Sequence, residues 1–222
     1  MMREALSAPR ILVTGFGPFP GADQNPTAEL IEWLGSQRLG ARQQPAEIAT
    51  AIIPTEWDVL PEMHAQMMAD HKPDVAIHFG LRTGGEAIHI EQRAQNWKSG
   101  EPDAAGERLS PSPVLTDKPR LLHTPYPVAR LVDHLKRQGL PAQLSVDAGP
   151  YICNMTFYLS LDAMGDRGNP RSALFVHVPP ITNSGSNADG TGFSQAQLRR
   201  CARAVIDHAL GEVRGIAIPD TI

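Results

Sequence analysis

One thiol, one imidazole and one carboxylate stand at positions that suit chemistry: Cys153, His177 and Glu91. Hydrolysis by a cysteine nucleophile needs this set of groups. The His takes the thiol proton and later protonates the leaving amine, while the acid orients the His. We therefore consider these three side chains first as candidates for covalent catalysis on an amide.

Cys153 lies where a predicted strand passes into a predicted helix. The stretch QLSVDA (143–148) predicts a short buried strand, because Leu144 and Val146 alternate with polar neighbours. From Tyr151 onward the apolar spacing becomes helical, so the thiol falls in the first turn of a helix. Unpaired amides and the positive end of the helix dipole favour a thiolate there. A lone Cys is more often a small buried hydrophobic residue, and both interpretations stay open.

His177 and Glu91 have less distinctive surroundings. His177 lies near the end of RSALFVHVPP (171–180), an apolar stretch that predicts a strand. A His at such a place can also hydrogen-bond to the backbone without a catalytic role. Glu91 follows Ile88 and Ile90 in a less regular segment. A carboxylate in this company is either a partnered functional group or part of a solvated strand face.

The length and charge of the chain narrow the class of protein. Its 222 residues are 41% hydrophobic, with a net charge of −4. This length predicts a single domain over residues 1–222, with residues 1–9 as a loose N-terminus. The weak negative charge argues against nucleic acid or a membrane surface as the partner. No apolar stretch approaches the length that spans a membrane.

The two cysteines point to a reducing compartment. Two Cys in a chain this long do not form a disulfide framework, and their scarcity suits a location where a thiol stays free. Cys201 belongs to the apolar stripe of the last predicted helix and is interpreted as a core residue. The N-terminus lacks the apolar segment of a signal peptide. We expect a cytoplasmic protein.

Apolar stretches alternate with amphipathic stretches along the chain. The predicted strands are 11–14, 47–54, 74–80, 143–148 and 171–180, and the predicted helices are 27–39, 55–71, 127–139, 151–163 and 194–213. This alternation predicts an α/β fold with an open, twisted, mostly parallel sheet that helices cover on both faces. Active sites in such sheets form beyond the C-terminal ends of the strands. The three candidate residues lie at or near these ends.

Several local signals refine these elements. Asn25 is predicted to cap the helix that Pro26 begins. Thr55 is predicted to cap the next helix, in which Pro61 is an interruption. Residues 98–126 contain many Pro and polar residues. A loop of this length is usually functional, so we interpret it as an active-site cover or an excursion from the fold.

A nucleotide or metal site is disfavoured. The turn with Gly15, Gly17 and Gly21 lacks the G-x-G-x-x-G spacing, and Pro18 and Pro20 remove amides that would hold a pyrophosphate. The His and Cys residues show no spacing typical of metal ligands. We expect no metal and no cofactor.

Three motifs resemble the pyroglutamyl peptidase I (pyrrolidone carboxyl peptidase) family of cysteine exopeptidases. VTGFGPFPGADQNPT (13–27) is similar to the opening loop of the family, LSVDAGPYICN (144–154) to its nucleophile motif and FVHVPP (175–180) to its His motif. The resemblance implies that Cys153 is the nucleophile and His177 the general base. It also implies a single three-layer α/β/α domain that occurs as a monomer or a homotetramer.

The acid position of the family corresponds to Glu91, which keeps the family spacing to Ala94 and Asn96. The sequence departs from the family pattern at Gln92, which stands in place of a basic residue. Glu86 is a less favoured substitute for the acid.

The resemblance further implies a substrate, namely peptides with an N-terminal pyroglutamate (5-oxoproline). Phe16, Phe19 and Tyr151 would wall a pocket for the flat lactam, and Asn25 would fix the entry loop or the substrate. Without the family, the two Phe residues would be ordinary core packing. Two alternatives remain: a related cysteine amidohydrolase with altered specificity, motivated by the changed segment 81–93, and a catalytically silent protein that binds a lactam or a peptide terminus.

Overall fold

The computed structural model describes residues 8–37, 46–167, 170–182 and 193–215, and the predicted loose N-terminus falls mostly outside these ranges. The strands are β1 (Arg10–Phe16), β2 (Glu47–Ile53), β3 (Val75–Leu81), β4 (Ile88–Glu91), β5 (Arg93–Gln95), β6 (Leu121–His123), β7 (Ala142–Ser145) and β8 (Ser172–Val178). The helices are α1 (Pro26–Gly35), α2 (Leu60–His71), α3 (Val128–Arg137), α4 (Ile152–Arg167) and α5 (Gln195–Arg214).

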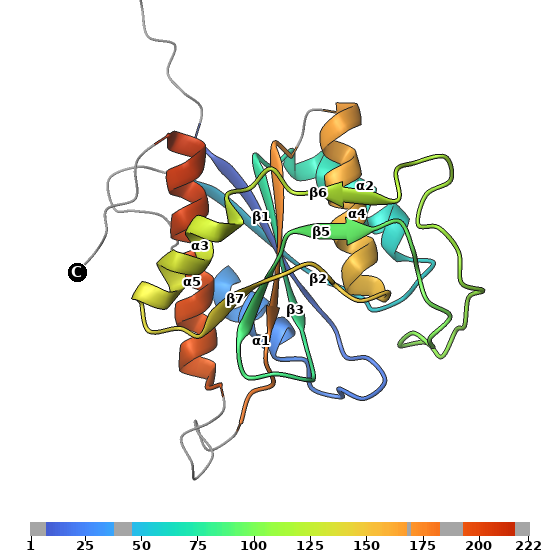
Figure 1. Cartoon of the computed structure of the whole chain (residues 1–222), viewed down its shortest axis with the longest axis horizontal. Coiled ribbons are helices and arrows are strands. Elements are labelled where there is room, and N and C mark those ends of the chain that lie inside the picture. Colours follow the sequence, from blue (N-terminus) through green and yellow to red (C-terminus); the bar gives the residue numbers. More distant parts are fainter. Residues whose placement is uncertain (1–7, 38–45, 168–169, 183–192, 216–222) are drawn as a thin grey trace, which may run out of the picture.

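A six-stranded sheet in the order β2-β1-β3-β8-β4-β7 forms the centre of the molecule (Figure 1). Its neighbouring strands pair in parallel except β4 and β8, which are antiparallel. Strands β5 and β6 form a separate two-stranded sheet. The predicted α/β fold with an open, mostly parallel sheet is confirmed.

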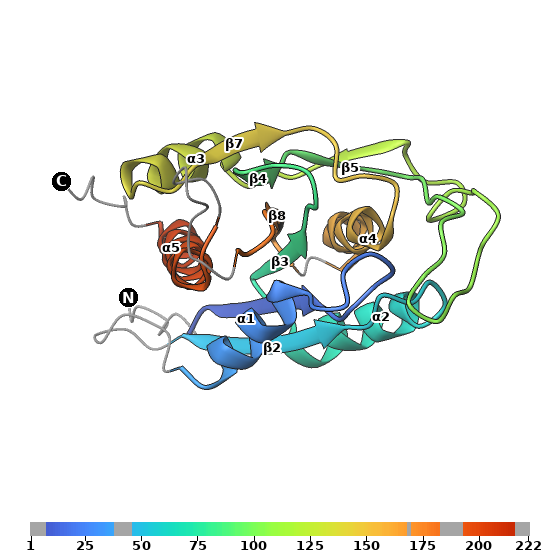
Figure 2. The same cartoon turned by 90° about the horizontal axis from the view of Figure 1, so that it is seen from below.

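Helices cover both faces of the large sheet (Figure 2). Successive side chains of a strand point to opposite faces. Accordingly, Ile11 and Val13 of β1 pack in one core with α1, α3 and α5, whereas Leu12 and Phe16 pack in a second core with α2 and α4. Burial on both faces explains why the central strands are almost continuously apolar in sequence.

Helix α1 begins as the sequence predicts. The Asn25 side chain accepts a hydrogen bond from the Thr27 backbone N–H at 3.1 Å, and Pro26 occupies the first turn. The Asn25 amide also donates to the Gly17 carbonyl at 3.0 Å, which joins the helix start to the loop after β1. The helix ends at Gly35, with Ser36 as its C-cap, so the predicted end at residue 39 is wrong.

Two predictions about α2 are wrong. Val59, not Thr55, occupies the N-cap position, and Pro61 lies in the first turn instead of interrupting the helix. Proline is tolerated there because the first amides of a helix have no intrahelical partner. The Thr55 hydroxyl instead donates to the Pro18 carbonyl.

The strand predicted at 143–148 is present as β7 (Ala142–Ser145), but the prediction that it is buried is wrong. Strand β7 lies at the edge of the sheet, where it pairs with β4, and the Leu144 and Val146 residues are 42% and 47% exposed. Only the alternation could be seen in the sequence, and alternation does not distinguish an edge strand from a central one. Within the described ranges, no helix is long and apolar enough to cross a membrane.

Candidate active site

A cavity of about 200 Å³ lies beyond the ends of β1, β2, β3 and β8. Cys153 and His177 both line it. The four residues for which the sequence predicts a role in binding also contribute to its wall: Phe16, Phe19, Asn25 and Tyr151. The structure therefore brings a thiol, an imidazole and an aromatic wall to one cavity.

His177 and Glu91 form a buried pair. The His177 Nδ1 atom lies 2.8 Å from Glu91 Oε1, and the two side chains are 5% and 0% exposed. A carboxylate accepts hydrogen bonds, so it holds the imidazole with the hydrogen on Nδ1 and leaves Nε2 as the basic nitrogen. The alternative acid, Glu86, is exposed and is not among the described residues that line the cavity.

The register of β4 on β8 creates this pair. His89 pairs with His177 and Ile90 with Val176 in an antiparallel ladder. Continuing this register places Glu91 opposite Phe175. Glu91 then lies diagonal to His177 on the same face of the sheet, within reach of a long side chain. Because Phe175 packs in the core beneath α4, this is also the face that carries Cys153.

Cys153 lies in the first turn of α4, as predicted, and is partly buried. Its Sγ atom approaches the backbone of β3 closely. A Cβ atom added to Gly80 would lie 3.1 Å from Sγ and 2.8 Å from the Phe175 ring. Only glycine leaves enough room at this point of β3 for the thiol and the ring together.

The start of the helix lowers the pKa of the Cys153 thiol, as predicted, but two other effects outweigh it. Burial and the nearby Glu91 carboxylate raise the pKa of the Cys153 thiol to about 12, and its own backbone N–H opposes this shift only partly. Desolvation disfavours the charged form, and a neighbouring negative charge adds to the effect. These effects disfavour the thiolate in the free protein, and a neighbouring base would promote its formation.

Aromatic rings form a connected wall around the cavity. The Tyr151 ring lies 5.0 Å from the Trp57 ring and 6.1 Å from the Phe19 ring. On the other side, the Phe175 ring lies 6.0 Å from Phe16 and 4.7 Å from the His177 ring. Such a wall suits a small flat group with little charge.

The segment 98–126, predicted as a cover or an excursion, holds two of these rings. The Tyr151 hydroxyl donates to the Pro102 carbonyl at 3.0 Å, and the Trp57 indole N–H donates to the Glu101 carbonyl at 3.0 Å. The segment thus supports the cavity wall from behind.

Six further residues line the cavity: Thr55, Leu81, Arg82, Thr83, Ala148 and Gly149. Leu81, Arg82 and Thr83 belong to the segment 81–93 that motivates the alternative of altered specificity, and the other three were not predicted. They follow strand ends, which is the general signal that could have found them. Arg82 is the charged residue among the described lining residues, and its guanidinium donates to the Asp147 carbonyl at 3.3 Å. Within the described ranges, no group of three or more His, Cys, Asp or Glu side chains could hold a metal ion.

Comparison with known proteins gives a consistent result. The pyroglutamyl peptidase family matches residues 9–210. The pyrrolidone-carboxylate peptidase of Pyrococcus furiosus is 34% identical over 173 residues, which is 78% of this chain and 81% of that protein. The enzyme of the same name from Clavibacter michiganensis is 30% identical over 212 residues, which is 95% of this chain and 97% of that protein.

Solved structures of pyrrolidone carboxyl peptidases are also similar to this chain. A crystal structure of a mutant pyrrolidone carboxyl peptidase from P. furiosus superimposes with a TM-score of 0.82 at 30% identity. The match covers 91% of this chain and 99% of that one.

Proposed function

Because this chain belongs to the pyroglutamyl peptidase family of cysteine peptidases, we propose that it removes an N-terminal pyroglutamate from peptides through Cys153, His177 and Glu91. The observation that carries this proposal is the single cavity that both Cys153 and His177 line, with Glu91 bonded to the imidazole behind them. The two free cysteines suit a reducing compartment, and we propose the cytoplasm as the location.

The first half of the reaction forms a thioester. His177 Nε2 takes the proton from Cys153 Sγ, and the sulfur attacks the pyroglutamyl carbonyl carbon. The resulting imidazolium gives that proton to the peptide nitrogen as the carbon–nitrogen bond breaks. Glu91 stabilises the imidazolium and keeps the ring oriented while it carries the proton.

The second half restores the enzyme. His177 takes a proton from a water molecule, whose oxygen attacks the thioester carbonyl. The carbon–sulfur bond then breaks, pyroglutamate leaves, and the sulfur regains its proton from the imidazolium. Backbone N–H groups in the first turn of α4 have no intrahelical partner and would stabilise the oxyanion in both halves.

The cavity wall supports a lactam substrate. A volume of about 200 Å³ with Phe16, Phe19 and Tyr151 in its wall suits a small flat ring. Asn25 is occupied by its bonds to Gly17 and Thr27, so it would act mainly by fixing the entry loop beside the substrate.

Hydrolysis of a pyroglutamyl fluorogenic amide by the purified protein tests the proposal. Turnover should disappear in Cys153→Ser, with the thermal unfolding curve retained, and in wild-type protein treated with iodoacetamide. Cys201→Ser is the matched control, because Cys201 is buried in the core on α5, away from the cavity. Full activity of Cys153→Ser would refute the assignment of the nucleophile.

Arg82 favours a second candidate function. A positive side chain in the wall of the cavity suits a substrate that carries a carboxylate near the scissile amide. The pyroglutamyl lactam is neutral and has no such carboxylate. This candidate is a cysteine amidohydrolase of altered specificity. It predicts thiol-dependent hydrolysis of an acidic amide with a kcat/KM above that of the pyroglutamyl amide.

A further inference from the structure

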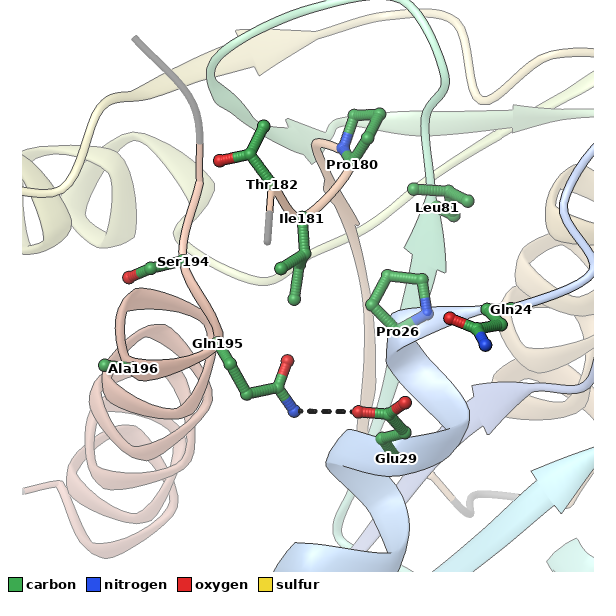
Figure 3. Close-up of a pocket in the computed structure, with 10 residues that line it drawn as sticks. All are labelled: Gln24, Pro26, Glu29, Leu81, Pro180, Ile181, Thr182, Ser194, Gln195 and Ala196. Atoms are coloured by element: carbon green, nitrogen blue, oxygen red, sulfur yellow. Dashed lines mark hydrogen bonds between the residues drawn. The ribbon is translucent and has the colours of Figure 1, made fainter. Parts of the chain in front are cut away.

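A second cavity, of about 480 Å³, lies between the start of α1, the end of β3 and the start of α5 (Figure 3). Leu81 lines both cavities. Asn25 lines the first, and its neighbours Gln24 and Pro26 line the second. The two spaces therefore meet at the end of β3 and at the start of α1.

The chain after β8 connects the active-site cavity to the second cavity. His177 lines the active-site cavity, and the chain that follows it continues to Pro180 and Ile181 in the wall of the second cavity. His177 must protonate the leaving nitrogen, so this nitrogen has to lie beside the imidazole. A peptide that leaves this nitrogen along the segment after His177 would enter the second cavity.

The walls of the second cavity suit a peptide. Pro26, Leu81 and Ile181 supply apolar surface, and Figure 3 shows the Gln195 side chain of α5 extending toward Glu29 of α1. The Gln195 amide donates to Glu29 Oε2 at 3.4 Å. The other described lining residues include the polar side chains of Gln24, Thr182 and Ser194, which can hydrogen-bond to a peptide. A cavity of this size with both apolar and polar residues in its wall can hold a ligand.

We infer that this second cavity, which we call the leaving-peptide groove, binds the residues that follow pyroglutamate in the substrate. The inference rests on the proposed function and adds to it a binding site for the leaving segment, with a preference for pyroglutamyl peptides that have several residues after the scissile bond. Contacts in the groove would contribute to kcat/KM for such peptides but not for a pyroglutamyl amide of a single aromatic ring.

Ala196 allows a direct test, because it lines the groove and is exposed in the first turn of α5. Ala196→Tyr would fill the groove without disturbing a core. We expect the ratio of kcat/KM for a pyroglutamyl tetrapeptide to that for the fluorogenic amide to fall about tenfold, mainly through KM. Gln24→Trp, at an exposed residue of another wall, should lower the same ratio.

The matched control is Ala129→Tyr, which changes an exposed alanine in the first turn of α3, outside both cavities. It should keep the wild-type ratio. If both groove variants fold and keep that ratio while hydrolysing the fluorogenic amide, the groove is refuted and the proposed function stands. If the folded wild-type protein hydrolyses neither substrate, the proposed function falls and this inference falls with it.

Discussion

His177 Nδ1 lies 2.8 Å from Glu91 Oε1, although the two residues are 86 positions apart in the chain. The contact depends on the antiparallel pairing of β4 with β8 in a sheet whose other pairs are parallel. The acid and the base thus lie on one face, beneath the helix that carries Cys153.

Glu91→Gln should lower kcat for the pyroglutamyl amide by about 10³–10⁴-fold, the size seen when the orienting acid of a catalytic triad loses its charge. Glutamine keeps the shape of the side chain, but it does not stabilise the imidazolium. Kinetics together with thermal unfolding would check this. Glu86→Gln, at an exposed residue, is the control and should behave as wild type. Equal activity of the two variants would contradict the role of Glu91.

Alkylation of Cys153 should be slow at pH 7 and faster at higher pH. Since burial and Glu91 raise its pKa to about 12, the thiolate fraction grows about tenfold per pH unit over this range. The rate of modification by iodoacetamide can be followed by the mass of the peptide that contains Cys153. Cys201, which is fully buried, should stay unmodified while the protein is folded. A rate that is already maximal at pH 7 would show a preformed thiolate instead.

Acid should destabilise the fold through a buried chain of polar side chains. Ser160 Oγ lies 2.7 Å from His64 Nε2 and 2.8 Å from His78 Nε2, and His78 Nδ1 lies 2.7 Å from Thr14 Oγ1. Burial lowers the pKa of His64 from 6.5 to about 4. Burial, with a smaller effect of His64, lowers the pKa of His78 from 6.5 to about 3.

The direction of this pH dependence follows from the number of protons that the folded and unfolded states bind. Below pH 6.5 the unfolded chain takes up protons that the folded protein refuses until about pH 4 or pH 3. The free energy of unfolding therefore falls with decreasing pH in this window, by up to about 1.4 kcal/mol per pH unit for each His. Urea unfolding at several pH values between 7 and 4 would measure how the free energy of unfolding depends on pH. This dependence should be weaker in His64→Gln than in His71→Gln, an exposed control on the same helix. An identical dependence in the two variants would rule out this contribution of His64.

Glu29 should make the leaving-peptide groove selective for charge. It is the charged residue among the described residues of that groove, and it is exposed. We expect pyroglutamyl peptides with Lys in the leaving segment to exceed those with Glu in kcat/KM by about two- to fivefold, the size of an exposed ion pair. Glu29→Gln should remove the preference and Glu32→Gln, an exposed neighbour on α1, should keep it. If Glu29→Gln keeps the preference for Lys over Glu, a group other than Glu29 is responsible for that preference.

Features that depend on neighbours in the chain could be predicted from the amino-acid sequence. The alternation of apolar stretches predicted the α/β fold, and the spacing after Tyr151 predicted that Cys153 begins a helix. Asn25 before Pro26 predicted the cap of α1, which the structure confirms. These features depend on side chains a few residues apart, so a linear pattern contains the information.

The contacts between these elements became visible in the folded chain alone. The antiparallel register of β4 joins Glu91 to His177, and the edge position of β7 exposes Leu144, which the sequence predicted to be buried. Burial beside Glu91 raises the pKa of Cys153, against the expectation from the helix start alone. Pairing partner, strand order and desolvation depend on residues distant in the chain, and no local pattern encodes the distance between them.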